Sequence, residues 1–419
     1  MSAETASIKK EYTLDKINDL PNSINQKWLT QRRMAVTILF FTNGFGFASL
    51  PTRLPELQRF YNVSNTELGL ILLCSSVGAL AAMLMSSRIM TRFGSRKVAT
   101  VTAIGFASVP PFLTFIPHIS VLLPLFFILG AAIGSLEVAM NAQAIEVERL
   151  FERPLMSSFH AFFSIGGGLG AAFGAAMTWG NMSVFVHFLA VSVLSVGLLV
   201  WAAFHLLDFK TTDKTAETTA KTESQKSIKW QRLTILPIAL LAFCSMASEG
   251  ALTNWSAIFC SQELHTTAAE SAFAFTIFTA AMTIGRLGGD KVTQRLGLYK
   301  TLIISLFIAF FGIFVLYAAT NLTLVLISLA SIGLGLSLTV PLTYSLAGNT
   351  EGVSPSVAIP MVSICGYASF FIMPPLVGVL SDVFGIRILV GILLVLGVAM
   401  LALLIYTSSL FKVSDVKIT

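Results

Sequence analysis

The chain has 419 residues, of which 55% are hydrophobic and only 11% are charged, and its mean hydropathy is +0.80. Soluble domains carry about 25% charged residues, so this composition excludes a soluble globular protein and indicates a polytopic membrane protein. The basic residues behind the net charge of +6 lie between apolar runs and not in one patch, which favours membrane topology over nucleic-acid binding as their explanation.

Twelve apolar runs follow one another along the chain, each close to the ~20 residues that span a bilayer. The polar first 33 residues show no cleavable signal peptide and are expected to form a largely disordered tail. Prolines inside the third, tenth and eleventh runs predict kinks or flexible points and not helix ends. The expected spans are 34–56, 66–88, 98–116, 119–147, 155–179, 183–207, 233–258, 269–289, 300–319, 322–347, 355–380 and 386–410.

The distribution of Lys and Arg predicts the orientation. With the N-terminus inside, 24 of the 27 Lys and Arg fall in cytoplasmic segments, so both termini are expected in the cytoplasm. The expected division is an N-terminal tail (1–33), an N-terminal six-helix bundle (34–207), a cytoplasmic linker (208–232), a C-terminal six-helix bundle (233–410) and a C-terminal tail (411–419).

An internal repeat supports two equivalent halves. The sequence Arg92-Phe-Gly94-Ser-Arg-Lys97 lies 203 residues before Arg295-Leu-Gly297-Leu-Tyr-Lys300, and the same offset aligns Gly130 with Gly333. Two six-helix halves in parallel repeat are the architecture expected of a two-bundle transporter. The offset aligns Val340 with Glu137, so the two halves share the arrangement of their helices but not their polar residues.

These basic loops resemble those of the major facilitator superfamily. Arg88–Lys97 is similar to its helix 2–3 signature, with Ser87 in place of the usual acidic residue, and Gly285–Gly297 to the helix 8–9 counterpart. The resemblance implies an all-α membrane protein with twelve transmembrane helices in two six-helix bundles, the major facilitator fold. It also implies a gating role for the residues of both loops, namely Arg88, Arg92, Gly94, Arg286, Asp290, Arg295 and Gly297.

A motif in the fourth apolar run resembles one particular branch of this superfamily. Leu136-Glu137-Val-Ala-Met-Asn141 is similar to the Glu-x-Ala-x-Asn of the fucose permease and related glucose/galactose transporters. His160-Ala-Phe-Phe-Ser164-Ile-Gly166 resembles YbjJ-type bacterial inner-membrane proteins. In the fucose permease an aspartate on helix 1 accompanies this glutamate, and Pro51 occupies its position here. The resemblance therefore does not imply every residue of that permease's proton-coupled sugar transport.

Glu137 and Asn141 lie one helical turn apart, so both can reach one ligand. A carboxylate near the middle of a membrane costs at least ~2.5–3.5 kcal/mol and is by default a functional hypothesis. Glu137 is predicted to load and release the coupling proton, and Asn141 to donate to and accept from a polar substrate. The alternative is a glutamate that joins helices by hydrogen bonds.

Glu249 is the second deep carboxylate, and Asn254 and Trp255 lie near it on the seventh span. Because helices 1, 4, 7 and 10 line the cavity in the superfamily, Glu249 is expected to face Glu137 and share proton coupling. The alternative places it in a hydrogen bond between bundles.

Other polar residues complete the expected cavity. The predicted substrate-binding residues are Asn43, Asn141, Asn254, Trp255 and Tyr344, the two aromatic rings by stacking on a sugar or else by simple packing. Arg53 is expected at the outer mouth, snorkelling or paired with Glu56. His160 is expected to relay protons or to cap an interface.

The sequence contains no nucleotide-binding domain, metal cluster or catalytic constellation, so we expect no enzyme activity and no cofactor. The leading hypothesis is a monomeric, proton-coupled importer of a small polar solute, a sugar or sugar derivative, in a bacterial inner membrane. Sodium can replace the proton on the same ligands. Proton-driven efflux of drugs or metabolites and a non-transporting receptor are the alternatives.

Overall fold

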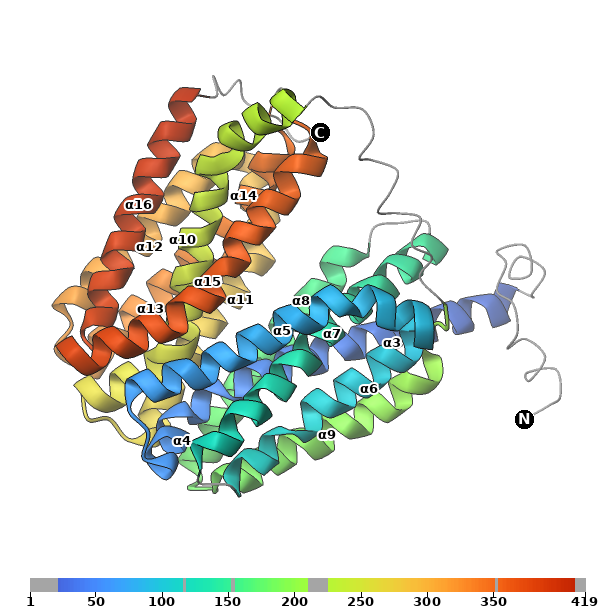
Figure 1. Ribbon diagram of the computed structural model, residues 1–419, viewed down its shortest axis with the longest axis horizontal. Coiled ribbons are helices and arrows are strands. Elements are labelled where there is room, and N and C mark those ends of the chain that lie inside the picture. The colour runs from blue at the N-terminus through green and yellow to red at the C-terminus, as the bar shows by residue number, and fades with distance from the viewer. Residues whose placement is uncertain (1–21, 116–117, 152–154, 210–224, 351–352, 411–419) are drawn as a thin grey trace.

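The computed structural model describes residues 22–115, 118–151, 155–209, 225–350 and 353–410, and this part of the chain is helical apart from short turns (Figure 1). The all-α prediction is therefore confirmed. Two bundles converge at one end of the molecule and separate at the other. The N-bundle contains α3 Asn22–Ser49, η1 Pro51–Arg53, α4 Leu54–Tyr61, α5 Asn65–Phe93, α6 Ser95–Ser108, η2 Pro110–Thr114, α7 Ile119–Phe151, α8 Met156–Trp179 and α9 Val184–His205. The C-bundle contains α10 Gln225–Glu263, α11 Ala268–Leu296, α12 Leu298–Ala318, α13 Leu322–Leu336, α14 Thr339–Gly348, α15 Pro355–Phe384 and α16 Ile388–Leu410.

Eleven helices within the described ranges are long and apolar enough to cross a membrane. The expected span that is missing from these eleven is the third, 98–116. It consists of α6, which has only 14 residues, followed by the 3₁₀ turn η2. Pro110 and Pro111 open that turn. Proline lacks the N–H donor and its ring clashes with the carbonyl of residue i−4, so the α-helix ends before them. The prediction that these prolines leave the helix unbroken is wrong here.

The tenth expected span is kinked. α13 ends at Leu336, α14 begins at Thr339, and the short interruption includes Ser337, the residue four positions before Pro341. Both intervening residues keep right-handed helical backbone angles, and Leu322–Gly348 still forms one membrane-spanning segment, so the prediction of a kink is confirmed for this span. α15 continues through its three internal prolines, as expected.

Helical structure extends past two expected boundaries. α3 begins at Asn22, inside the segment 1–33 that the sequence suggests to be a disordered tail. α10 begins at Gln225, inside the expected linker 208–232. Both extensions continue a membrane-spanning helix, and elongation of an existing helix adds one backbone hydrogen bond for each residue fixed.

The local structure repeats with the same 203-residue offset as the sequence. α5 and α11 both have 29 residues, and each begins with a capping box, Ser64 with Glu67 in one and Thr267 with Glu270 in the other. The following glycines, Gly94 and Gly297, have φ of +84° and +81°, a region that favours glycine. α5 and α11 thus share their start, their length and the turn that follows them.

Glycines bring α5 and α7 into backbone contact. A Cβ added at Gly130 would lie 1.8 Å from the carbonyl oxygen of Ser75, and one at Gly134 would lie 2.2 Å from that of Ala79. Small residues allow such close approach of helices in a membrane. This glycine face packs against α5, which fixes the rotation of the helix that carries Glu137.

Substitution of Gly130 by alanine is expected to destabilise the protein. The new methyl group has to displace the backbone of Ser75, whereas a methyl at Gly105, a matched glycine in α6, meets no atom within 4 Å. Gly105→Ala is expected to be neutral or to stabilise by up to ~1 kcal/mol, because alanine favours helix. Thermal unfolding in detergent measures both. Equal melting temperatures for the two variants would show that α5 and α7 do not need this contact.

Candidate functional site

The bundles are joined at the end where α5 starts and α15 finishes, which we call the closed end. The Asp382 carboxylate of α15 accepts the backbone N–H groups of Asn65 (3.0 Å) and Thr66 (2.8 Å), the first residues of α5. Further along the same helices, Ser76 Oγ donates to the carbonyl of Phe370 at 2.8 Å. A carboxylate at a helix N-terminus interacts favourably with the helix dipole.

Three amide side chains add to the closed end. Gln58 Nε2 donates to Asn65 Oδ1 at 2.7 Å, and Gln262 of α10 donates to both of them, at 3.2 and 3.0 Å. The triad therefore joins α4 and α5 of the N-bundle to α10 of the C-bundle. Each amide both donates and accepts, so the triad is held without a net charge.

A second seam runs between α8 and α11. Thr276 Oγ1 donates to the carbonyl of Ala171 at 3.0 Å, and Thr283 Oγ1 to that of Ser164 at 3.2 Å. Both acceptor carbonyls belong to α8 of the N-bundle, and both donors belong to α11 of the C-bundle. The bundles join at the closed end and along this seam, and they lie apart at the opposite end of the molecule (Figure 1).

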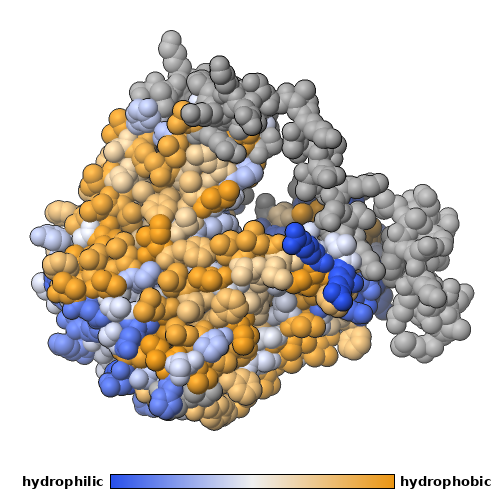
Figure 2. Space-filling model, in the orientation of Figure 1, coloured by the Kyte–Doolittle hydropathy of each residue, from blue (hydrophilic) through white to orange (hydrophobic). Residues whose placement is uncertain are grey.

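The opposite end is open, and the space-filling view shows a notch between the two lobes on that side (Figure 2). Arg88, Arg92 and Arg295, which were expected to act in gating, have exposed side chains there. None of them forms an ion pair with a residue whose side chain the structure describes. The side chain of Asp290 lies outside the described part of the chain. These basic residues are therefore positioned at the mouth of a cavity that is open at this end.

Glu137 lies within α7, and Asn141 lies one turn further along, as the spacing predicts. Asn141 Nδ2 donates to the Glu137 carbonyl at 2.8 Å and to its carboxylate at 3.2 Å. Both side chains are partly exposed. Each keeps capacity for a further partner, because a carboxylate has about four lone-pair sites and an amide oxygen accepts as well.

One tyrosine of the C-bundle lies within electrostatic range of this pair, and a second lies near the first. Tyr367 of α15 interacts electrostatically with Glu137 of the N-bundle and with Tyr344 of α14. The Tyr344 hydroxyl donates to Ser363 Oγ at 3.0 Å. A tyrosine of the C-bundle thus lies within electrostatic range of the Glu137 carboxylate of the N-bundle.

Glu249 has a partner that the sequence did not reveal. Arg286 of α11, expected to act in gating, donates to Glu249 Oε1 at 3.0 Å, and both side chains are partly exposed. His160 of α8 interacts electrostatically with Arg286 and packs edge-on against Phe40. The two carboxylates therefore differ in their surroundings, because Glu249 pairs with an arginine, whereas Glu137 forms no ion pair with any residue that the structure describes.

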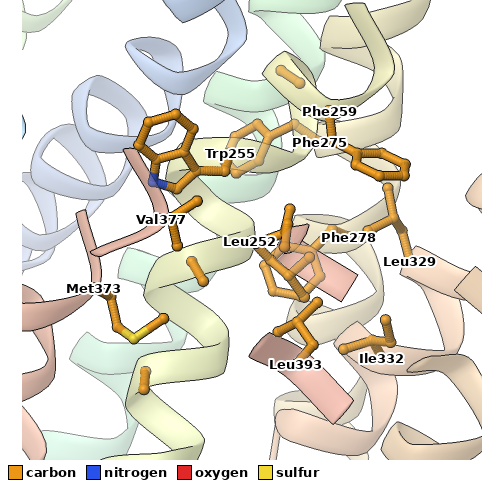
Figure 3. Packing of buried hydrophobic residues seen from close by; sticks show 14 of the residues in the cluster. Leu252, Trp255, Phe259, Phe275, Phe278, Leu329, Ile332, Met373, Val377 and Leu393 are labelled. Carbon is orange, nitrogen blue, oxygen red and sulfur yellow. The ribbon is translucent and has the colours of Figure 1, made fainter. Parts of the chain in front are cut away.

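Three of the residues that were expected to bind the substrate have their side chains directed to other partners or buried in the core. Asn43 is buried, with Nδ2 3.6 Å from the Met140 sulfur, and Asn254 Nδ2 donates back to the Gly250 carbonyl at 3.0 Å. Trp255 is fully buried in the C-bundle, where it packs among Leu252, Phe259 and Val377 (Figure 3). In this conformation the indole is therefore part of the hydrophobic core and does not reach the cavity.

Arg53 is fully buried, not at an exposed mouth. It pairs with Glu56 at 2.8 Å, as one of the two expectations had it, and it also donates to His187 Nδ1 and to the Met182 carbonyl, both at 3.0 Å. These contacts join η1 to the start of α9. An arginine with this many partners is occupied in holding the N-bundle together.

Sequence reasoning missed Tyr367, Ser363, Asp382 and Gln262. A signal was present for the first two, because Ser363 and Tyr367 lie four residues apart, and therefore on one face, in a mainly apolar helix. Asp382 and Gln262 lie near helix ends, where polar residues are common and carry little information.

Two bundles around a polar cavity that is closed at one end and open at the other define a membrane transporter. The chain belongs to the major facilitator superfamily, whose family model matches residues 36–351.

Curated relatives cover most of the chain. It is 32% identical over 349 residues to the uncharacterised transporter y4wD of Sinorhizobium fredii, covering 83% of this chain and 91% of that protein. It is 29% identical over 356 residues to the membrane protein MosC of Rhizobium meliloti, covering 84% of each. An MFS-type transporter of Yersinia pestis is 27% identical, covering 86% of this chain and 91% of that protein. The family consists of transporters and two of these three relatives are named as transporters, so this chain is a transporter and not an enzyme.

Solved structures share the fold. A mutant of the nucleoside transporter NupG superposes with a TM-score of 0.71 at 13% identity, covering 91% of this chain and 100% of that one. A bacterial homologue of the lysosomal transporter Spinster, in an inward-facing and unoccupied conformation, gives 0.64 at 12% identity, covering 91% and 95%. At these identities the likeness concerns the fold alone.

Proposed function

We propose that the protein takes up a small polar solute, a sugar or sugar derivative, together with a proton, by alternating access. The observation that carries the proposal is the hydrogen-bonded Glu137–Asn141 pair, whose carboxylate lies within electrostatic range of Tyr367 of the other bundle. Asn141 and Tyr344 offer donors and acceptors to hydroxyl groups, and the tyrosine rings offer apolar faces to a sugar ring. The resemblance of Glu137 and Asn141 to the fucose permease pattern agrees with this substrate class.

Glu137 is the proposed coupling residue because no arginine or lysine within the described ranges forms an ion pair with it. A carboxyl group that lies among apolar helices and has no cationic partner can take up a proton at a modest cost. Protonation then favours one orientation of the bundles, and the solute adds its own preference. Sodium in place of the proton is a variant of the same mechanism.

Glu249 is proposed as a second coupling carboxylate with a different action. Uptake of a proton by Glu249 would break its ion pair with Arg286, which joins α10 to α11. Arg88, Arg92, Gly94, Asp290, Arg295 and Gly297 are proposed to close the open end when the closed end opens. The protein is proposed to act as a monomer in a bacterial inner membrane, with both termini in the cytoplasm, as the Lys and Arg distribution favours.

The proposal is tested by accumulation of radiolabelled solutes in proteoliposomes under an inward proton gradient. The panel contains monosaccharides, sugar acids and nucleosides, since a nucleoside also carries a sugar ring. Accumulation of one class that disappears with a protonophore is the expected result. Accumulation that follows a sodium gradient assigns the coupling to sodium. No accumulation, together with proton-driven efflux of hydrophobic cations, would contradict uptake and favour the exporter.

A further inference from the structure

A groove lies on the outer surface of the N-bundle, between the start of α6 and the end of α9, and has a volume of about 400 Å³. These two helices are on the side of the N-bundle away from the C-bundle (Figure 1), so the groove is separate from the transport cavity. Its polar lining consists of Arg96, Lys97 and Thr100, with Asp208 beside them. Volumes of this size accommodate a small ligand or a headgroup.

Arg96 is held in place across the groove. Its Nε donates to the Ala203 carbonyl of α9 at 2.7 Å, which joins α6 to α9. Its two terminal nitrogens donate to no other residue in the described part of the chain. Lys97 is exposed and forms no ion pair with a described residue. A fixed guanidinium beside a mobile ammonium is a suitable pair for a phosphate group.

The groove also has apolar walls that face outward. Val101 is 70% exposed and Phe204 is 68% exposed, and both belong to helices that cross the membrane or flank its surface. Nearby on α9, Trp201 stacks on His205 with ring centroids 4.1 Å apart. Tryptophan is enriched at the membrane–water interface, which places the groove at the level of the lipid headgroups.

We propose that this groove binds the headgroup of an anionic phospholipid of the cytoplasmic leaflet. The phosphate lies against Arg96 and Lys97, and the acyl chains run along Val101 and Phe204. Two cations against one carboxylate leave a net positive charge, which favours an anionic lipid over a zwitterionic one. The Asp208 carboxylate accepts a hydroxyl of a headgroup such as that of phosphatidylglycerol. Basic pockets on the cytoplasmic side bind such headgroups in other membrane proteins.

Native mass spectrometry of the full chain in detergent tests the proposal, with titrations of phosphatidylglycerol, phosphatidylethanolamine and inorganic phosphate. Phosphatidylglycerol is expected to bind most tightly. The double variant Arg96→Gln with Lys97→Gln is expected to weaken it about thirtyfold, since each basic residue near the surface contributes about fivefold. The matched control is Lys291→Gln with Lys300→Gln, which removes two exposed basic residues from the same end of the C-bundle.

Lys97→Gln alone leaves the bond from Arg96 to Ala203 in place and is expected to weaken binding about fivefold. Three results would overturn the proposal: phosphatidylethanolamine binding as tightly as phosphatidylglycerol, inorganic phosphate displacing the lipid at equal concentration, or equal losses in the double variant and its control. The readout is lipid binding, so it is independent of the transported solute.

Discussion

Replacement of Glu137 by glutamine is expected to abolish accumulation of the solute while leaving its exchange across the membrane intact. Glutamine keeps the shape of the side chain and can still bond to Asn141, but it cannot take up a proton. One pH unit is worth about 1.4 kcal/mol for each proton, so a symporter that moves one proton accumulates its solute about tenfold under that gradient. The variant is expected to show no accumulation above the outside concentration.

Counterflow of labelled solute into liposomes preloaded with unlabelled solute separates coupling from binding. Glu137→Gln is expected to retain counterflow, because the site and the bundle motion are preserved. Glu146→Gln is the matched control, since Glu146 lies on the same helix and its partly exposed carboxylate pairs with Arg149. Accumulation that survives in Glu137→Gln would transfer the coupling role to Glu249.

Replacement of Asp382 by asparagine is expected to increase the fraction of molecules in which the closed end is open. The carboxylate accepts two N–H groups at the start of α5, and hydrogen bonds to a charged group contribute about 1.5–3 kcal/mol. Asparagine keeps one acceptor oxygen and loses the charge. If this weakens the contact between the bundles by about 1.4 kcal/mol, the fraction of molecules that are open at this end is expected to rise about tenfold.

Labelling of a cysteine in the interface measures that population. Leu72 lies on the same face of α5 as Ser76, is buried, and can be replaced by cysteine in a background without the four native cysteines. A membrane-impermeant maleimide added outside is expected to react about tenfold faster in Asp382→Asn. Glu263→Gln is the control, because its ion pair with Arg387 stays within the C-bundle. An unchanged rate would show that Asp382 does not hold the bundles together.

The fold could be predicted far into its details because local patterns determine them. Apolar runs of spanning length gave the helices, and the 203-residue offset that relates Gly94 to Gly297 also relates the capping boxes of α5 and α11. Caps and turns depend on a few neighbouring residues, so two copies of one pattern fold alike. The kink near Pro341 was predicted, but the end of α6 before Pro110 was not, because whether a membrane helix continues through a proline depends on the partners that its neighbours supply.

The candidate site could be predicted only where residues lie on one helix. Glu137 and Asn141 are one turn apart, so their contact follows from the spacing. The pairing of Glu249 with Arg286 depends on the rotation of α10 against α11, which composition does not determine. Trp255 shows the same limit, since polar neighbours in the sequence suggested a cavity residue and tertiary packing buried it.

Proton movement driven by the solute itself tests the central claim most directly. Proteoliposomes with an entrapped pH-sensitive dye, and no imposed gradient, receive the solute identified by the accumulation assay. The account predicts acidification of the interior in the wild type and none in Glu137→Gln at an equal rate of solute counterflow. Solute entry without acidification in the wild type, or acidification of the same size in the variant, would contradict it.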